Sequence, residues 1–168
     1  MLLEDQDRSR WDRTEIAEGL GLLERAEEVG PPGPYQVQAA IAAVHARSQR
    51  PEETDWEEIV RLYDALSAMA PSPVVQLNRA VAVAMADGPQ RGLSLIDALV
   101  AGGELDRYHL LHSARADLLR RMGRRVEAAE AYGRALELAT NPVERAFLGE
   151  RLREVSGPRG DHPEVRER

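Results

Sequence analysis

The segment spanning residues 108–141 constrains the fold most, because two helical patterns meet there at a tight turn. Apolar residues recur at steps of three and four on both sides of the turn, which places them along one stripe of each helix. These residues are Leu110, Leu111, Ala114, Leu118 and Leu119 before the turn, and Val126, Ala129, Tyr132 and Leu136 after it. Gly123 ends the first pattern, at a position that favours a residue with positive φ. The segment is therefore predicted to be a helical hairpin.

The small and aromatic residues of this hairpin suggest a repeated unit. The spacing of Gly123, Ala128, Tyr132 and Ala135 resembles the tetratricopeptide repeat, a helix-turn-helix unit of about 34 residues. Tyr63 precedes Tyr132 by about two such lengths. A single unit cannot bury its apolar face, so we expect neighbouring units to cover it. The middle unit departs from the pattern, with glycine or leucine at positions 92 and 93 where alanine is expected.

Capping signals divide the rest of the chain into further helices. Asp12 with Glu15, and Thr54 with Glu57, are each spaced as a capping box. Ser72 precedes a proline in the way that an N-cap does. The predicted helices span residues 12–29, 35–48, 54–69, 72–88, 89–100 and 142–155, in addition to the two of the hairpin.

Two of these helices carry clear burial patterns. The third is expected to bury one stripe, formed by Ile59, Leu62, Tyr63, Leu66 and Met69. The fourth, over residues 72–88, is apolar nearly all round, which is typical of a central, buried helix. Pairing helices two with three, four with five, and six with seven gives three units, with the first helix leading and the eighth as a cap.

Composition supports helix packing over a β-architecture. The chain has 168 residues, of which 43% are apolar and only 4% aromatic, a balance that favours close contacts between helices. The sequence predicts an all-α, tetratricopeptide-like, right-handed superhelix of about eight antiparallel helices. Residues 12–155 are expected to form this domain. Residues 1–11 are expected to join it to an upstream segment, and residues 156–168 to be a disordered tail.

Charge and residue usage exclude several classes of function. The net charge is −7, and the chain has neither lysine nor cysteine. An acidic chain of this kind is a poor nucleic-acid binder, and without cysteine it has no disulfide, thiolate metal site or thiol nucleophile. No apolar run approaches the 18 or so residues of a membrane span, and no secretory signal is present. We expect a cytoplasmic protein that binds neither membrane nor nucleic acid.

Histidines and carboxylates provide little evidence for an enzyme. His109 and His112 lie three residues apart on one predicted helix face, a geometry that can bind a metal ion. No acidic metal-binding pattern accompanies them, and no glycine-rich phosphate loop is present. Packed-helix histidines are more often hydrogen-bonded core or groove residues. We expect no catalytic residues, no metal and no cofactor.

A binding surface fits the pattern better, because the first helices of stacked pairs line a concave groove. Polar and aromatic residues lacking an evident packing role occur on these helices: Tyr35, Gln38, His45, Gln76, Asn78, Arg79, His109, His112 and Arg115. The amide of Asn78 is predicted either to satisfy a buried backbone group or to face a ligand. Four arginines at positions 120–125 either contact an acidic surface or lie favourably at a helix C-terminus.

Several stretches, taken in order, resemble the C-terminal extension of a group of bacterial extracytoplasmic-function RNA polymerase sigma factors with a tetratricopeptide-like domain behind the sigma core. These stretches are DQDRSRWD, AEGLGLLERA, GPYQVQAAIAAVHA, DWEEIVRLYDAL, SPVVQLNRAVAVAMADGP, YHLLHSARADLLRRMGR and AAEAYGRAL. The resemblance covers roughly residues 2–155. No stretch resembles the sigma regions that bind the −10 and −35 promoter elements. The chain is therefore expected to be a regulatory part of a longer polypeptide.

The resemblance implies a role in transcription initiation, with the sigma core of the same polypeptide and RNA polymerase as partners. Its junction residues would be Asp5, Gln6, Asp7, Arg8, Arg10, Trp11 and Asp12. We expect this run to dock the sigma core against the helices, with Trp11 as the anchor. Two alternatives remain open. One is a stand-alone adaptor that binds a peptide in its groove, and the other is a small-molecule sensor with a pocket near His109, His112 and Tyr35.

Overall fold

The computed structural model describes residues 8–28, 30–48 and 50–157. Within these ranges the chain is all-α, with eight α-helices and no strand, as the sequence predicts. The helices are α1 (Arg13–Glu27), α2 (Pro34–Arg47), α3 (Trp56–Met69), α4 (Pro73–Asp87), α5 (Pro89–Gly102), α6 (His109–Arg121), α7 (Arg125–Leu138) and α8 (Pro142–Ser156). Two short 3-10 turns, η2 (Arg8–Arg10) and η3 (Pro51–Glu53), precede α1 and α3.

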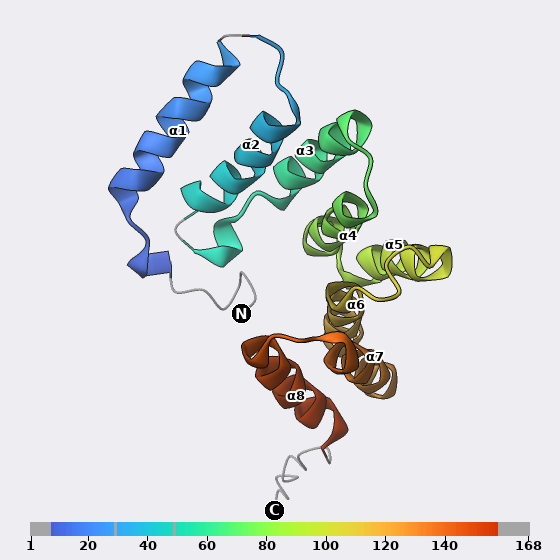
Figure 1. Cartoon of the computed structure of the whole chain (residues 1–168). Helices are drawn as coiled ribbons and strands as arrows, with labels where there is room; N and C mark the ends of the chain where they lie inside the picture. The colour runs from blue at the N-terminus through green and yellow to red at the C-terminus, as the bar shows by residue number, and fades with distance from the viewer. Residues whose placement is uncertain (1–7, 29, 49, 158–168) are drawn as a thin grey trace, which may run out of the picture.

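Successive helices form a curved array (Figure 1). Each helix packs mainly against its neighbours in sequence, and the α6–α7 hairpin has the most extensive contact. In the view of Figure 1, α1 and α8 lie at opposite ends of the array, and both ends curve toward the same side. The arrangement agrees with stacked helical hairpins, while the right-handed tetratricopeptide superhelix remains a prediction.

Most predicted helix caps are confirmed. Asp12 accepts hydrogen bonds from the backbone of the first turn of α1, and Ser72 and Asn141 do the same for α4 and α8. Gly123 has a φ of 73°, the left-handed conformation expected after α6. The prediction that Thr54 caps the third helix is wrong. Asp55 caps α3 instead, with its Oδ1 2.8 Å from the backbone nitrogen of Glu58.

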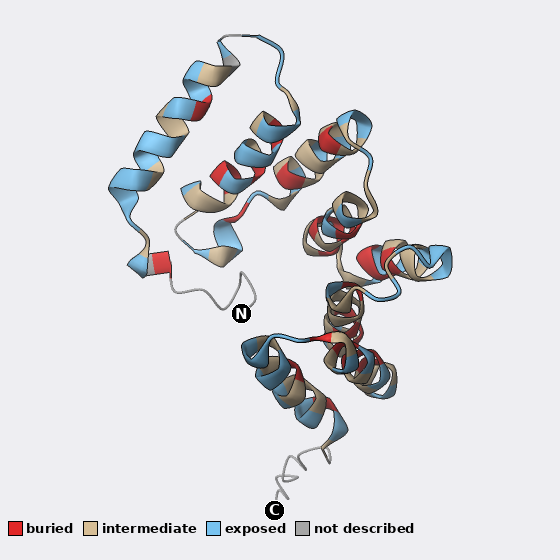
Figure 2. Ribbon diagram, viewed as in Figure 1, coloured by how far each residue is buried: buried red, intermediate tan, exposed pale blue. Residues whose placement is uncertain are grey.

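Buried side chains form two clusters that meet at α4. The first contains Val37, Ile41, Val44, Ile59, Leu66 and Ala82, from α2 to α4. The second runs from α4 to α8 and is centred on Leu93, Ile96, Leu111, Leu119 and Tyr132. Figure 2 shows these buried segments between consecutive helices, with α1 mostly exposed. In α1, Leu23 is the buried apolar residue among those whose side chains are described.

Some residues of the predicted stripes are exposed. The exposed fractions are 43% for Leu110, 75% for Val126 and 45% for Met69. Leu110 and Val126 lie in the first turns of α6 and α7, and Met69 is the last residue of α3. At such ends the neighbouring helix no longer covers the stripe, although the spacing of the residues is correct. Helix α4 is likewise not buried all round, because Val74 in its first turn and Asn78 are exposed.

Helices α4 and α5 approach each other closely at Gly92. A Cβ atom built on Gly92 would lie 2.3 Å from the Cβ of Ala84 and 2.7 Å from the carbonyl oxygen of Ala80. Both distances are shorter than real side chains show. The close packing of α5 on α4 therefore requires glycine at this position.

An equivalent arginine–aspartate ion pair joins consecutive helices at two places, between α3 and α4 and between α5 and α6. Arg79 of α4 contacts Asp64 of α3, with 2.5 Å between nitrogen and oxygen. Arg115 of α6 contacts Asp97 of α5 in the same way at 2.7 Å. Partly exposed pairs like these stabilise a fold by at most about 1 kcal/mol each.

Candidate interaction site at the N-terminal junction

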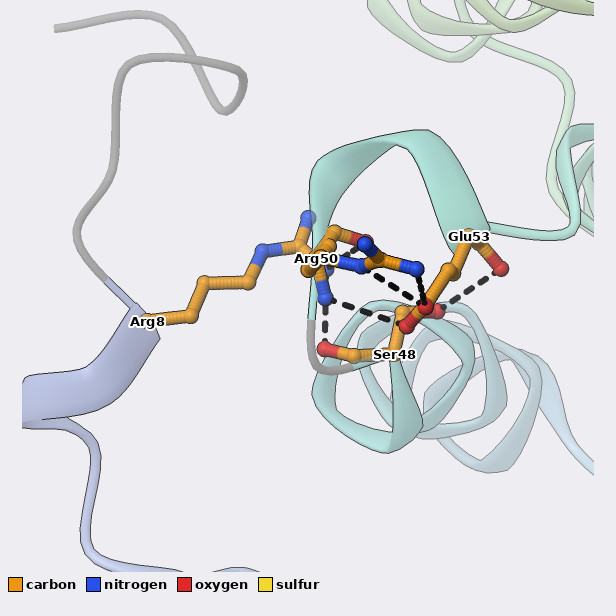
Figure 3. Close-up of polar contacts among 4 residues, drawn as sticks. All are labelled: Arg8, Ser48, Arg50 and Glu53. Atoms are coloured by element: carbon orange, nitrogen blue, oxygen red, sulfur yellow. Dashed lines mark hydrogen bonds and ion pairs between the residues drawn. The ribbon is translucent and has the colours of Figure 1, made fainter.

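Arg8 is the most unusual polar residue of the array, because its side chain is only 3% exposed although it belongs to a short turn before α1. Its guanidinium reaches the end of α2 and the connection to α3 (Figure 3). Nη1 donates to the carbonyl oxygens of His45, Ser48 and Arg50 at 3.2, 3.0 and 3.4 Å. Nη2 donates to the hydroxyl of Thr54 at 3.4 Å. Arg8 therefore attaches the η2 turn to the α2–α3 hairpin, about 40 residues further along the chain.

The end of α2 attracts this cation for a simple physical reason. The last carbonyl groups of a helix lack partners within the helix, and the macrodipole makes that end negative. Arginine fills the same role elsewhere in the array. Arg145 donates to carbonyls at the end of α7 at 2.7 and 2.8 Å, and Arg125 to carbonyls at the end of α8. Among the described residues, no carboxylate pairs with Arg8.

Three aromatic side chains, Trp11, His45 and Trp56, lie near the Arg8 guanidinium and the end of α2. The guanidinium carbon of Arg8 lies 5.1 Å from the centroid of the Trp11 ring, a cation–π distance. His45 of α2 meets Trp56 of α3 edge-on, with 5.2 Å between ring centroids. Burial lowers the pKa of His45 below its ordinary value, and the neighbouring Arg8 cation lowers it further. His45 is therefore neutral at pH 7.

A hollow of about 310 Å³ opens beside this site, at the end of α2. It is lined by Val44, Arg47, Ser48, Glu53, Asp55 and Glu58. The Ser48 hydroxyl lies within hydrogen-bond distance of two carbonyl oxygens, those of Val44 at 3.2 Å and Glu53 at 3.3 Å, and its one hydrogen is shared between them. The Arg50 guanidinium pairs with the Glu53 carboxylate at 2.5 Å. These contacts keep the connection between α2 and α3 in place under the Arg8 guanidinium.

The predicted junction residues have different positions. Asp5, Gln6 and Asp7 lie outside the described residues. Arg10 is exposed, Trp11 is partly exposed, and Asp12 serves as the N-cap of α1. The role of Trp11 as the anchor for the sigma core stays a prediction, while the residue of this run that is buried against the array is Arg8. The one available sequence signal was the placement of Arg8 three residues before a tryptophan.

Three of the predicted groove residues have exposed side chains: Tyr35, Gln38 and Asn78. Tyr35 is 86% exposed in the first turn of α2. The prediction that the Asn78 amide satisfies a buried backbone group is wrong, because the residue is exposed. The alternative, that this amide faces a ligand, stays a prediction. Gln76, by contrast, donates to the hydroxyl of Ser67 on α3.

The remaining groove residues have partners within the array. Arg79 and Arg115 form the ion pairs between units described above. His109 Nε2 lies 3.2 Å from the Glu144 carboxylate on α8, and His112 Nε2 lies 2.9 Å from the carbonyl oxygen of Asp106. Their contacts with a binding partner stay a prediction. In the described part of the chain, no group of three or more histidines and carboxylates could hold a metal ion.

The sensor alternative depended on Tyr35 lying near the two histidines. Tyr35 begins α2, whereas His109 and His112 belong to α6, and these helices lie in different parts of the array (Figure 1). The structure does not bring these three residues together. The hollow described above is at the α2–α3 hairpin instead.

The four arginines around the α6–α7 turn all have contacts within the chain. Arg120 pairs with Asp117 at 2.6 Å, and Arg124 with Glu127 at 2.6 Å. Arg121 reaches the Met85 sulfur at 3.0 Å, and Arg125 donates to the end of α8. These contacts favour the interpretation that the cluster stabilises the hairpin and its neighbours.

The comparisons with known proteins find a relative whose function is not stated. The chain is 51% identical over 148 residues to an uncharacterized protein of Rhizobium meliloti (strain 1021). The aligned segment covers 88% of the chain but 34% of the relative, so the chain spans about a third of that protein's length. No family model matches the sequence, and no solved structure matches it. Among the described helices, none is long and apolar enough to cross a membrane.

Substitution of Arg8 tests whether the junction is fastened as described. Arg8→Ala should lower the free energy of unfolding by about 2 kcal/mol, because buried carbonyl groups lose a charged donor. Urea unfolding followed by circular dichroism measures this change. Arg10→Ala, in the same turn but exposed, should change stability by less than about 0.5 kcal/mol. Equal effects of the two substitutions would contradict an anchoring role for Arg8.

Proposed function

We propose that this chain is the regulatory protein-interaction domain of a sigma factor, which modulates the activity of the sigma core in transcription initiation. Its partners are then the sigma core of the same polypeptide and RNA polymerase. The helices form a rigid scaffold, and the run around Arg8 holds the neighbouring core against it. The chain itself performs no chemistry and contacts no nucleic acid under this proposal.

The observation that carries the proposal is the buried Arg8. A turn that precedes the first helix is expected to move freely unless something holds it. Here a buried guanidinium with four acceptors from the α2–α3 hairpin fixes its position. These contacts fix the orientation of the η2 turn relative to the helices. A neighbouring domain joined to that turn could then dock in one orientation.

Two further observations support the same proposal. The ordered stretches quoted above resemble the extension of such sigma factors over most of the chain. The Rhizobium meliloti relative is nearly three times as long as the aligned segment, since that segment covers 34% of it. A longer polypeptide around this domain is what a sigma-factor extension needs.

Binding to the rest of that relative tests the proposal. The full chain should retain the part of the Rhizobium meliloti protein outside the aligned segment in a pull-down. The Arg8→Ala/Trp11→Ala double variant should lose this binding, whereas Arg134→Ala, on α7 and outside both the junction run and the groove, should keep it. Binding kept by the double variant would move the interface to the exposed groove residues, as in a peptide-binding adaptor.

A transcription assay tests the sigma assignment separately. The same part of the relative should direct core RNA polymerase to a specific promoter in run-off transcription, and adding the chain should change the amount of transcript. No promoter-specific transcript would contradict the assignment, even if the two parts bind each other. A transcript that is unaffected by the chain would contradict a regulatory role.

A further inference from the structure

His45 lies at the centre of the contacts that fasten Arg8. Its backbone oxygen accepts the 3.2 Å hydrogen bond from Arg8, and its imidazole lies against Trp56. The Nδ1 atom of the ring is inaccessible to solvent and has no hydrogen-bond partner among the described residues. In a neutral imidazole this Nδ1 can be the nitrogen without a hydrogen, so no N–H group is buried without an acceptor. A protonated imidazole carries an N–H donor on both nitrogens, and one of them would be buried without an acceptor.

We propose that His45 and Arg8 form a pH-sensitive latch, in which a proton on the His45 imidazole releases Arg8 and with it the η2 turn from the end of α2. The latch acts within the chain and does not depend on the sigma-factor proposal. It makes the docking of the N-terminal junction reversible without unfolding the helices.

Within the part of the chain that the structure describes, the surrounding charges do not offset a second cation at this point. Besides Arg8, the described charged residues around this end of α2 are Arg13, Arg47, Arg50, Glu53, Asp55 and Glu58. Glu53 already pairs with Arg50, and the Asp55 carboxylate caps α3. Of the charged groups in the described structure, Arg8 alone contributes to the pKa of His45, and it lowers that pKa in addition to the effect of burial.

The sign of the pH effect follows from this lowered pKa. Above pH 6.5 or so, His45 is neutral in both the docked and the released state, so docking is at full strength. Below that pH, the released state binds the proton more readily, and docking weakens progressively. The weakening continues until the pH passes the lowered pKa of the docked state. One proton is involved, so the docking equilibrium changes by at most about tenfold per pH unit.

The chain carries its own reporters for this event. The chain has two tryptophans, and both contact the residues of the proposed latch, Trp11 contacting Arg8 and Trp56 contacting His45. Trp11 lies beside the Arg8 guanidinium and reports release of η2, while Trp56 touches the His45 ring and reports its protonation. Each gives one indole N–H signal in a two-dimensional NMR spectrum of the nitrogen-15-labelled full chain.

A titration of the full chain from pH 8 to pH 5.5 tests the latch. Both indole signals should shift along one common curve. The Trp11 signal should move toward the position that it has in Arg8→Ala, where η2 is released at every pH. In His45→Gln the Trp11 signal should stay constant, because no proton can be taken up at this position. His45→Phe, also neutral and able to meet Trp56 edge-on, serves if the glutamine variant loses helical circular dichroism.

His112→Gln is the matched control, since His112 belongs to α6 and contacts the Asp106 carbonyl. It should leave both curves unchanged. A Trp56 signal that titrates while Trp11 stays constant would overturn the latch, because His45 would then be protonated with Arg8 in place. A Trp11 shift of equal size in His45→Gln, or no shift of either signal in the wild-type chain, would also overturn it. Carboxylates titrate near pH 4, well below this window.

Discussion

Replacing Gly92 by alanine should lower the free energy of unfolding by about 3 kcal/mol, because the added methyl group has no space. The new Cβ would lie 2.3 Å from the Cβ of Ala84 and 2.9 Å from its Cα. A flexible side chain could turn aside, but backbone atoms of α4 cannot. Helices α4 and α5 would have to move apart, and this would loosen the second core cluster, which contains Ala80, Ala84 and Leu93. Urea unfolding of the variant measures the loss.

Gly133→Ala is the matched control, since Gly133 also lies within a helix but a Cβ there would have nothing within 4 Å. Alanine has the higher helix propensity, so this variant should be more stable by about 0.5–1 kcal/mol. If both substitutions stabilise the protein, the close approach of α4 and α5 at Gly92 does not exist in solution. If only Gly92→Ala destabilises it, steric exclusion is the cause.

Tyr132→Ala should be at least as damaging, with a loss of about 3–5 kcal/mol. The side chain is 1% exposed and is the largest of the fully buried side chains in the described structure. Its neighbours on the same face of α7, Ala128 and Ala135, are fully buried and small, so they cannot expand into the space. The cavity would therefore remain open. Calorimetry and urea unfolding both measure this effect.

Tyr132→Phe separates packing from hydrogen bonding. This substitution keeps the ring but removes the hydroxyl that interacts with Arg120, which also pairs with Asp117. The expected loss is about 1 kcal/mol, typical of one hydrogen bond. A phenylalanine variant as unstable as the alanine variant would show that the polar contact, rather than the buried ring, holds the last hairpin together.

Local features of the fold could be predicted because local chemistry specifies them. Asp12, Ser72 and Asn141 cap their helices through bonds to the next two or three residues, so the sequence alone reveals them. Thr54 shows the limit of such reasoning. Its spacing fits a capping box, but its hydroxyl accepts a bond from Arg8, which is 46 positions away in sequence, and the next residue caps the helix instead.

The candidate site was less predictable than the helices. The run around Trp11 could be selected from the sequence, but the burial of Arg8 could not. The sequence shows no packing role for the groove residues Arg79 and Arg115, but each has an acidic partner on the preceding helix. A helical pattern shows which face a residue occupies. It does not show which charge the neighbouring helix places opposite.

The all-α class, the number of helices, the turn at Gly123 and the predicted caps other than Thr54 follow from the sequence alone. Those features depend on residues within one or two helical turns of each other. The packing of the helices is needed to show that Arg8 is buried on the end of α2, that Gly92 lies against the backbone of α4, and that the buried nitrogen of His45 has no partner in the described structure. Each of these depends on atoms that only the packing of separate helices brings within a few ångströms.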